Sequence, residues 1–184
     1  MIFKTESKQT TISKKVSLKG VGLHTGQEVE INFLPAEIND GYKFCRIDLE
    51  GHPIINADAN LVTNTQRGTC LEKNGVTIQT CEHVLAALVG LEIDNVIIEL
   101  SASEPPIMDG SSKYFIEALE SAEIKELNAF REVFVVKDVI SYVDEASGSE
   151  ITIIPSDEYQ VTTMVDFGTK VLGTQNATLQ HLYD

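Results

Sequence analysis

Residues 80–100 read TCEHVLAALVGLEIDNVIIEL and join the clearest helix signal in the chain to its clearest buried strand. Four apolar residues recur at helical spacing in this stretch: Val84, Leu85, Leu88 and Val89. They predict a helix that follows Thr80 as its N-cap and that Gly90 weakens or ends. Residues 95–100 predict a buried strand directly afterwards. This close succession indicates a domain in which helices pack on a sheet.

Strand signals surround this stretch. Before it, strands are expected at residues 10–18, 28–33, 42–49, 69–72 and 76–79, the last two joined as a hairpin through Asn74-Gly75. A second helix is expected from Ser111 or Ser112, with four residues facing inward: Phe115, Ile116, Leu119 and Ala122.

The pattern changes after a boundary expected at residues 127–130. Beyond it, strands are expected at residues 132–136, 139–143, 150–154 and 160–165. The predicted class is α+β, a two-layer arrangement of a mostly antiparallel sheet with two helices on one face. The predicted domains are residues 1–127 and residues 131–184.

Composition restricts the function classes. The 184 residues carry a net charge of −14, and the excess of acids lies in residues 76–184, with nineteen acids against five bases. This charge disfavours a nucleic-acid partner, and an anionic ligand is expected to prefer the balanced first half. No apolar run approaches the ~20 residues of a membrane span, and the N-terminus lacks a secretory signal, so a cytoplasmic protein is expected. Three cysteines without a C-x-x-C motif argue against a disulfide framework or a zinc ribbon.

Residues 20–26, GVGLHTG, form a glycine-rich turn between two expected strands. The spacing departs from G-x-G-x-x-G, and a strand rather than a helix follows, which excludes a dinucleotide site. The turn is expected to expose His24, free to donate a hydrogen bond to an anion. The alternative is a histidine that merely caps the turn.

The pair Glu82-His83 is the sharper chemical signal. Both residues fall in the first helical turn, where the helix dipole keeps a carboxylate ionised. Adjacent helical residues point about 100° apart and can flank one point in space. His83 would bind a metal while Glu82 addresses a water on it; the alternative is an ordinary surface helix start.

The rest of a metal site is not evident from spacing. The other histidines are His24, His52 and His181, and neither H-x-x-x-D nor H-E-x-x-H occurs. Glu104 and Asp109 suggest a carboxylate pair, but a Pro-Pro loop and a helix start explain both more simply.

Four segments occur in the following order: GVGLHTG (20–26), TCEHVLAAL (80–88), LEIDNV (91–96) and PIMDGS (106–111). Together they resemble the UDP-3-O-acyl-N-acetylglucosamine deacetylase family, zinc amidases that commit Gram-negative bacteria to lipid A synthesis. The resemblance is strong over residues 9–125 and loose over residues 130–184. It implies two similar α+β domains with the active site between them. Residues 131–184 would then be only the opening strands of the second domain.

The resemblance assigns roles residue by residue. His83 matches a zinc ligand, and Glu82 matches the general base for hydrolysis of the N-acetyl group. His24 matches a histidine near the nucleotide and diphosphate end of the UDP-sugar substrate. Asp109 matches a structural aspartate, and Thr69 lies on a segment that borders the site, where residues 66–68 (QRG) depart from the commoner apolar pattern.

The resemblance also implies missing parts. The other two zinc ligands belong to an H-K-x-x-D helix that this chain lacks, because His181 is followed only by Leu182-Tyr183-Asp184. We therefore expect an N-terminal portion of a longer enzyme, inactive alone, with one of three zinc ligands. The rival hypothesis is a non-catalytic module that binds a ligand or partner. Incomplete strands beyond Val143 are expected to pair with another copy, fold back or stay poorly ordered.

Overall fold

The computed structural model describes residues 2–157 and 159–179. They form two compact units, one spanning Glu6–Arg131 and the other made of the residues before Glu6 and those from Glu132 onward. Two helices and many antiparallel strands confirm the predicted α+β class.

The Glu6–Arg131 unit is built on a five-stranded sheet. Its order is β2 (Val16–Val21), β3 (Glu28–Pro35), β9 (Val96–Leu100), β4 (Tyr42–Arg46) and β5 (Ile54–Asn56). Neighbouring strands run antiparallel except β4 and β9, which are parallel. The predicted mostly antiparallel sheet is therefore confirmed.

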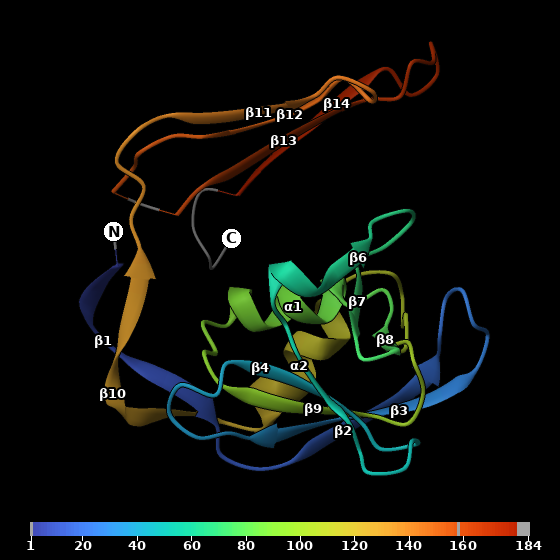
Figure 1. The fold of residues 1–184 in the computed structure, drawn as a ribbon, viewed down its shortest axis with the longest axis vertical. Helices are drawn as coiled ribbons and strands as arrows, with labels where there is room; N and C mark the ends of the chain where they lie inside the picture. The colour runs from blue at the N-terminus through green and yellow to red at the C-terminus, as the bar shows by residue number, and fades with distance from the viewer. Residues whose placement is uncertain (1, 158, 180–184) are drawn as a thin grey trace. The chain divides into compact units, whose positions relative to one another are not determined.

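Helices α1 (Glu82–Gly90) and α2 (Lys113–Ser121) lie over the same face of this sheet (Figure 1). The core forms between them and the strands, and Phe33, Phe44 and Phe115 are completely buried in it. The Phe33 and Phe115 rings meet edge to face with centroids 6.4 Å apart, which joins β3 to α2. The inward face predicted for the second helix is confirmed: Phe115, Leu119 and Ala122 are buried, and Ile116 is partly buried against the same core.

A smaller sheet supports the start of α1. It contains β6 (Val62–Asn64), β7 (Cys70–Lys73) and β8 (Val76–Ile78), and the short 3-10 helix η1 (Ala59–Leu61) precedes it. Asn74 and Gly75 have φ values of 53° and 77°, as a type I′ turn requires. The predicted Asn-Gly hairpin is confirmed.

Strands β1 (Ile2–Ile12) and β10 (Ile124–Phe134) pair with each other and correct two predictions. Residues 10–18 are not one strand, because the chain bends after Ile12 and Ser13 donates its backbone N–H to the carbonyls of Ala122 and Glu123. The strand expected at residues 132–136 begins at Ile124, so residues 127–130 lie inside β10, and the two compact units divide just after them, between Arg131 and Glu132. That the later residues open a second α+β domain stays a prediction.

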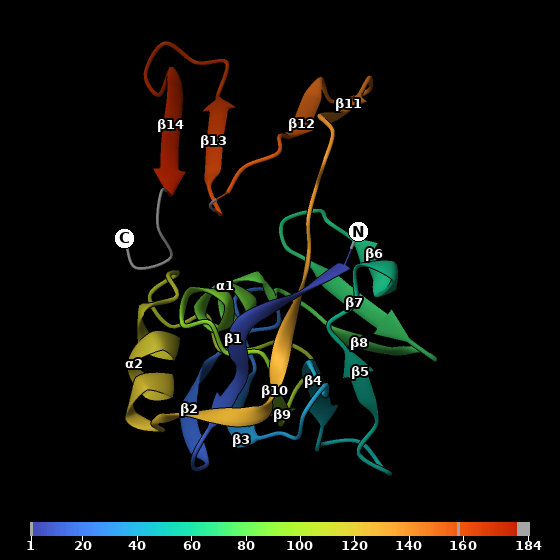
Figure 2. The same cartoon turned by 90° about the vertical axis from the view of Figure 1, so that its left-hand side faces the viewer.

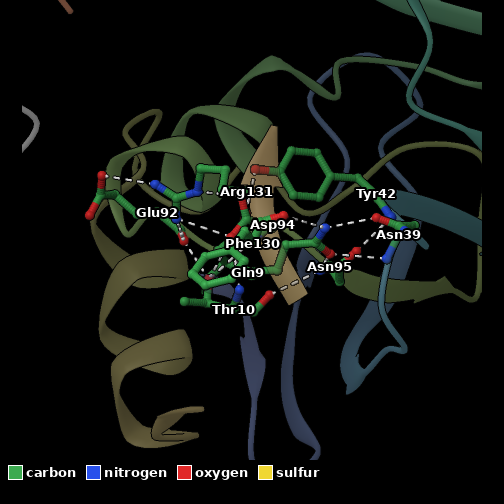
Figure 3. Close-up of polar contacts among 11 residues, drawn as sticks. Gln9, Thr10, Asn39, Tyr42, Glu92, Asp94, Asn95, Phe130 and Arg131 are labelled. Atoms are coloured by element: carbon green, nitrogen blue, oxygen red, sulfur yellow. Dashed lines mark hydrogen bonds and ion pairs between the residues drawn. The ribbon is translucent and has the colours of Figure 1, made fainter. Parts of the chain in front are cut away.

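An ionic network fixes β1 and β10 to the turn after α1 (Figure 3). The Arg131 guanidinium pairs with Asp94 at 2.8 Å and with Glu92 at 3.2 Å. The Asp94 carboxylate also accepts the Thr10 backbone N–H at 2.8 Å. Since Glu92 and Asp94 lie in the short connection between α1 and β9, this network ties the end of the Glu6–Arg131 unit to its central sheet.

The later strands form two separate hairpins, β11 (Ile140–Asp144) with β12 (Ser149–Ile153) and β13 (Val161–Asp166) with β14 (Thr174–Leu179), as Figure 2 shows. Their apolar side chains are largely exposed, with Tyr142 at 66% and Met164 at 73%. The expected self-association stays a prediction, and His181 lies outside the described residues. Neither α1 nor α2, the α-helices of the described residues, has the length and apolarity that crossing a membrane requires.

Candidate active site

Three loops meet at the N-terminus of α1: residues 22–27 between β2 and β3, residues 65–69 between β6 and β7, and residues 101–112 between β9 and α2. Backbone hydrogen bonds join them, from Ile107 to the Val21 carbonyl at 3.0 Å and from Cys81 to the Thr69 carbonyl at 3.4 Å. Segments far apart in the sequence, including three of the four motifs noted above, therefore converge on one helix end.

Helix α1 begins one residue later than predicted. Cys81 is its N-cap and makes no side-chain capping bond, whereas Thr80 has a φ of 50°. A β-branched residue rarely adopts this left-handed conformation, which costs about 1–3 kcal/mol. The Thr80 hydroxyl instead donates to the Glu104 carboxylate at 2.8 Å, so the N-cap prediction for Thr80 was wrong. Glu82 and His83 remain in the first turn of α1, as predicted.

The Glu82 carboxylate is half-buried and held by one oxygen. Its Oε2 accepts the Thr69 backbone N–H at 2.9 Å. A Cβ at position 68 would lie 3.3 Å from Oε1, so Gly68 leaves that second oxygen uncrowded. One oxygen is thus fixed by the backbone while the other stays approachable, as a positioned general base requires.

His83 is half-buried, and its backbone carbonyl accepts the Ser112 hydroxyl at 2.9 Å. Within the described part of the chain, no hydrogen bond engages its imidazole ring, which leaves a ring nitrogen available as a ligand. Burial, followed by the neighbouring Glu82 charge, raises the pKa of the Cys81 thiol to about 12, so Cys81 stays protonated and is a poor ligand.

The donor set fits one zinc ligand but not a complete catalytic site. A catalytic zinc takes three protein ligands and keeps one open position. Residues 2–157 and 159–179 contain no group of three or more His, Cys, Asp or Glu side chains arranged to hold a metal ion. His83 therefore fits as one of the three protein ligands that a catalytic zinc needs.

His24 lies on the β2–β3 loop and is exposed, as predicted. Its ring is not free, however, because Nε2 lies 3.1 Å from the Arg67 backbone carbonyl. A carbonyl can only accept, so this contact requires the proton on Nε2 and leaves Nδ1 as the acceptor of a neutral ring. The expectation that His24 is free to donate a hydrogen bond to an anion is thereby corrected, because Nε2 already donates to Arg67.

Glu104 is the site residue whose role the sequence analysis missed. It is completely buried, and it accepts hydrogen bonds from the backbone N–H groups of His24 and Thr25 and from the hydroxyls of Thr25 and Thr80. Burial acts to raise the pKa of Glu104, but the bonds from Thr25, Thr80 and His24 together lower it below its ordinary value. Its partners lie 24 to 80 residues away, so local sequence held no signal for them.

The remaining predicted residues differ in their placement. Thr69 directly contacts Glu82 through its backbone, as described above. Asp109 is exposed and accepts the Ser111 hydroxyl at 2.7 Å, which lowers the pKa of Asp109. Ser111 in turn accepts the Lys113 N–H at 3.2 Å at the start of α2. Among the described residues, no hydrogen bond joins Asp109 to Glu82, His83 or His24.

Comparison with known proteins supplies the family. A sequence model of UDP-3-O-acyl N-acetylglycosamine deacetylases matches residues 9–183. A bifunctional enzyme LpxC/FabZ from Bacteroides thetaiotaomicron is 41% identical over 177 residues, which cover 96% of this chain and 38% of that protein. A UDP-3-O-acyl-N-acetylglucosamine deacetylase from Hahella chejuensis is 41% identical over 165 residues, covering 90% of this chain and 54% of that protein. The chain thus spans between about a third and a little over half of these relatives. It belongs to the UDP-3-O-acyl N-acetylglycosamine deacetylase family.

Proposed function

We propose that this chain supplies the general base and one zinc ligand of a deacetylase that removes the N-acetyl group of UDP-3-O-acyl-N-acetylglucosamine in lipid A biosynthesis. Family membership and the printed names of its relatives support the reaction class. The observation that carries the proposal is the geometry at the start of α1. There the Glu82 carboxylate accepts a hydrogen bond from the Thr69 backbone N–H, and the ring of the next residue, His83, makes no hydrogen bond with a described residue.

Glu82 acts as the base. Its carboxylate lies in the first turn of α1, and the Thr69 backbone N–H holds one oxygen in place. The carboxylate takes a proton from the water that adds to the acetamide carbonyl carbon. The C–N bond then breaks as the nitrogen takes up the proton that Glu82 received, and acetate and a free amine result.

His83 is the proposed zinc ligand. Zinc, when bound, would polarise the attacking water and bring its pKa toward about 7. One imidazole does not hold catalytic zinc tightly, and two further protein ligands are needed. We therefore propose that this chain alone has no measurable turnover.

His24 is proposed to contact the nucleotide and diphosphate end of the substrate. It is exposed on a loop beside Arg67, whose guanidinium makes no hydrogen bond or ion pair within the described residues. An exposed cation beside an imidazole suits an anionic group. Thr69 and Asp109 are given structural roles, Thr69 by holding Glu82 and Asp109 by ordering the turn before α2.

Acetate release tests the proposal. The assay uses UDP-3-O-acyl-N-acetylglucosamine, zinc and the full product of the reading frame that contains this sequence. Glu82→Gln is expected to lower kcat by roughly 10²- to 10⁴-fold, because the base is lost and the shape is kept. His83→Ala is expected to reduce zinc content and activity together. The matched control Glu72→Gln alters an exposed glutamate on β7 and should stay within about twofold.

Unchanged acetate release in both site variants would contradict the assigned roles. Absence of acetate release from the wild-type product would contradict the deacetylase and favour a non-catalytic module that binds a ligand or partner. Turnover by this chain alone near the rate of the full product would contradict the proposed incompleteness of its site.

A further inference from the structure

The buried carboxylate of Glu104 lacks a cationic partner among the ion pairs of the described residues. Hydrogen bonds alone compensate its charge, four donor groups in all. Burying a carboxylate is costly unless such donors surround it. A carboxylate offers these four donor groups two acceptor oxygens, whereas a neutral amide side chain would offer only one.

The donors come from two separate parts of the unit. His24 and Thr25 belong to the β2–β3 loop, and their backbone N–H groups reach Glu104 at 3.1 and 2.9 Å. Thr80 belongs to the segment that leads into α1, and its hydroxyl reaches Glu104 at 2.8 Å. The Glu104 side chain therefore ties the backbone of His24 to Thr80, which lies two residues before Glu82.

Gly22 is the matching feature on the β2–β3 loop. A Cβ at this position would lie 2.4 Å from the Thr25 hydroxyl oxygen and 2.6 Å from Glu104 Oε2. Both atoms belong to the same hydrogen bond, so any larger side chain would displace the loop from the carboxylate. The glycine is required by this close approach.

A second chain of contacts closes the arrangement. The His24 ring donates to the Arg67 carbonyl, and two residues later the Thr69 N–H donates to Glu82. The three loops around α1 are thus linked both through Glu104 and through residues 67–69. A shift of the β2–β3 loop would move the imidazole of His24 relative to Glu82 and His83.

We infer that Glu104 is a positioning residue that holds His24 in register with the Glu82-His83 pair. Glu104 touches neither zinc nor substrate in this assignment, and it acts through the backbone of His24 and the hydroxyl of Thr80. An effect of Glu104 on substrate binding rests on the proposed function of His24. The positioning of His24 by Glu104 does not.

Nuclear magnetic resonance on this chain tests the structural part. In Glu104→Gln, hydrogen exchange of the His24 and Thr25 amides should rise on the order of tenfold or more, because a charge-assisted acceptor is lost. The His24 Nε2–H signal should disappear into solvent exchange, while the amides of β4 stay protected. The control Glu99→Gln, which removes a half-buried acid on β9, should leave the His24 signals unchanged.

Gly22→Ala provides a second variant, because it disturbs the same contact and leaves Glu104 intact. It should reproduce the changes at His24 and Thr25, and it keeps the test valid if Glu104→Gln does not fold. Wild-type exchange and an intact His24 ring signal in whichever variant folds would overturn the inference.

Uridine diphosphate binding tests the functional part through a double-mutant cycle. His24→Ala and Glu104→Gln should each weaken binding, and the double variant should bind no more weakly than His24→Ala alone. If the double variant weakens uridine diphosphate binding by the product of the two single effects, Glu104 does not act through His24. If His24→Ala binds uridine diphosphate as well as the wild type does, the proposed role of His24 fails, and the resonance data still decide the positioning.

Discussion

The Glu6–Arg131 unit and the strands after Glu132 carry the same kind of sequence signal but bury it differently. In the first, Ile31, Phe33 and Ile98 are completely buried beneath α1 and α2. In the second, Phe134 is 72% exposed and Met164 is 73% exposed, and no helix follows α2 within the described residues. Alternating apolar residues specify a strand, but a covering layer is needed to turn that strand into a core.

A pair of phenylalanine substitutions gives the largest expected contrast. Phe33→Ala should lower the free energy of unfolding by about 3–5 kcal/mol, because it leaves a cavity beside Phe115. Phe134→Ala should change it by less than about 0.5 kcal/mol, because the ring is already exposed. Denaturant unfolding of both variants measures the difference, and equal losses would mean that the later strands have a core of their own.

The ionic network at Arg131 tests where the first unit ends. Asp94→Ala removes a partner from a pair whose side chains are 21% and 22% exposed, and it should cost about 2 kcal/mol of unfolding free energy. Lys14→Ala breaks an exposed pair with Glu123 and should cost at most about 0.5 kcal/mol. If both variants unfold at the same denaturant concentration, β10 is not fixed to the unit through Arg131.

The smallest expected effect is a pH dependence at Glu104. Its pKa in the folded state lies below the ordinary value of 4.5, so the folded protein favours the ionised form. The stabilisation is therefore present above pH 4.5 and is lost as the pH falls through the lowered pKa. The difference in unfolding free energy between the wild type and Glu104→Gln should shrink from pH 7 to pH 3. If this difference in unfolding free energy grows as the pH falls, the pKa of Glu104 is not lowered in the folded state.

Local sequence was sufficient for elements with local causes. The Asn74-Gly75 turn needs two left-handed residues, and the end of α1 at Gly90 follows from the low helix propensity of glycine. Residues 127–130 could not be recognised as part of a strand, because β10 pairs with β1, more than a hundred residues away. Pairing at that distance has no local signal.

The motifs predicted candidate residues but not the contacts that hold them. They single out Glu82, His83 and His24, whose assigned roles stay predictions, and the structure gathers their loops at the N-terminus of α1. Thr80 was misassigned because Glu104 takes the hydroxyl that would otherwise cap α1. Glu104 itself looked like a loop residue, since nothing in its own sequence neighbourhood reports the four donors that surround it.

A crystal structure of the zinc-loaded full reading-frame product, with zinc located by anomalous scattering, tests the assignment of α1 most directly. We predict a zinc peak bonded to a ring nitrogen of His83, with Glu82 unligated and facing the open coordination position. A peak on His52, or a His83 ring directed away from the metal, would contradict it.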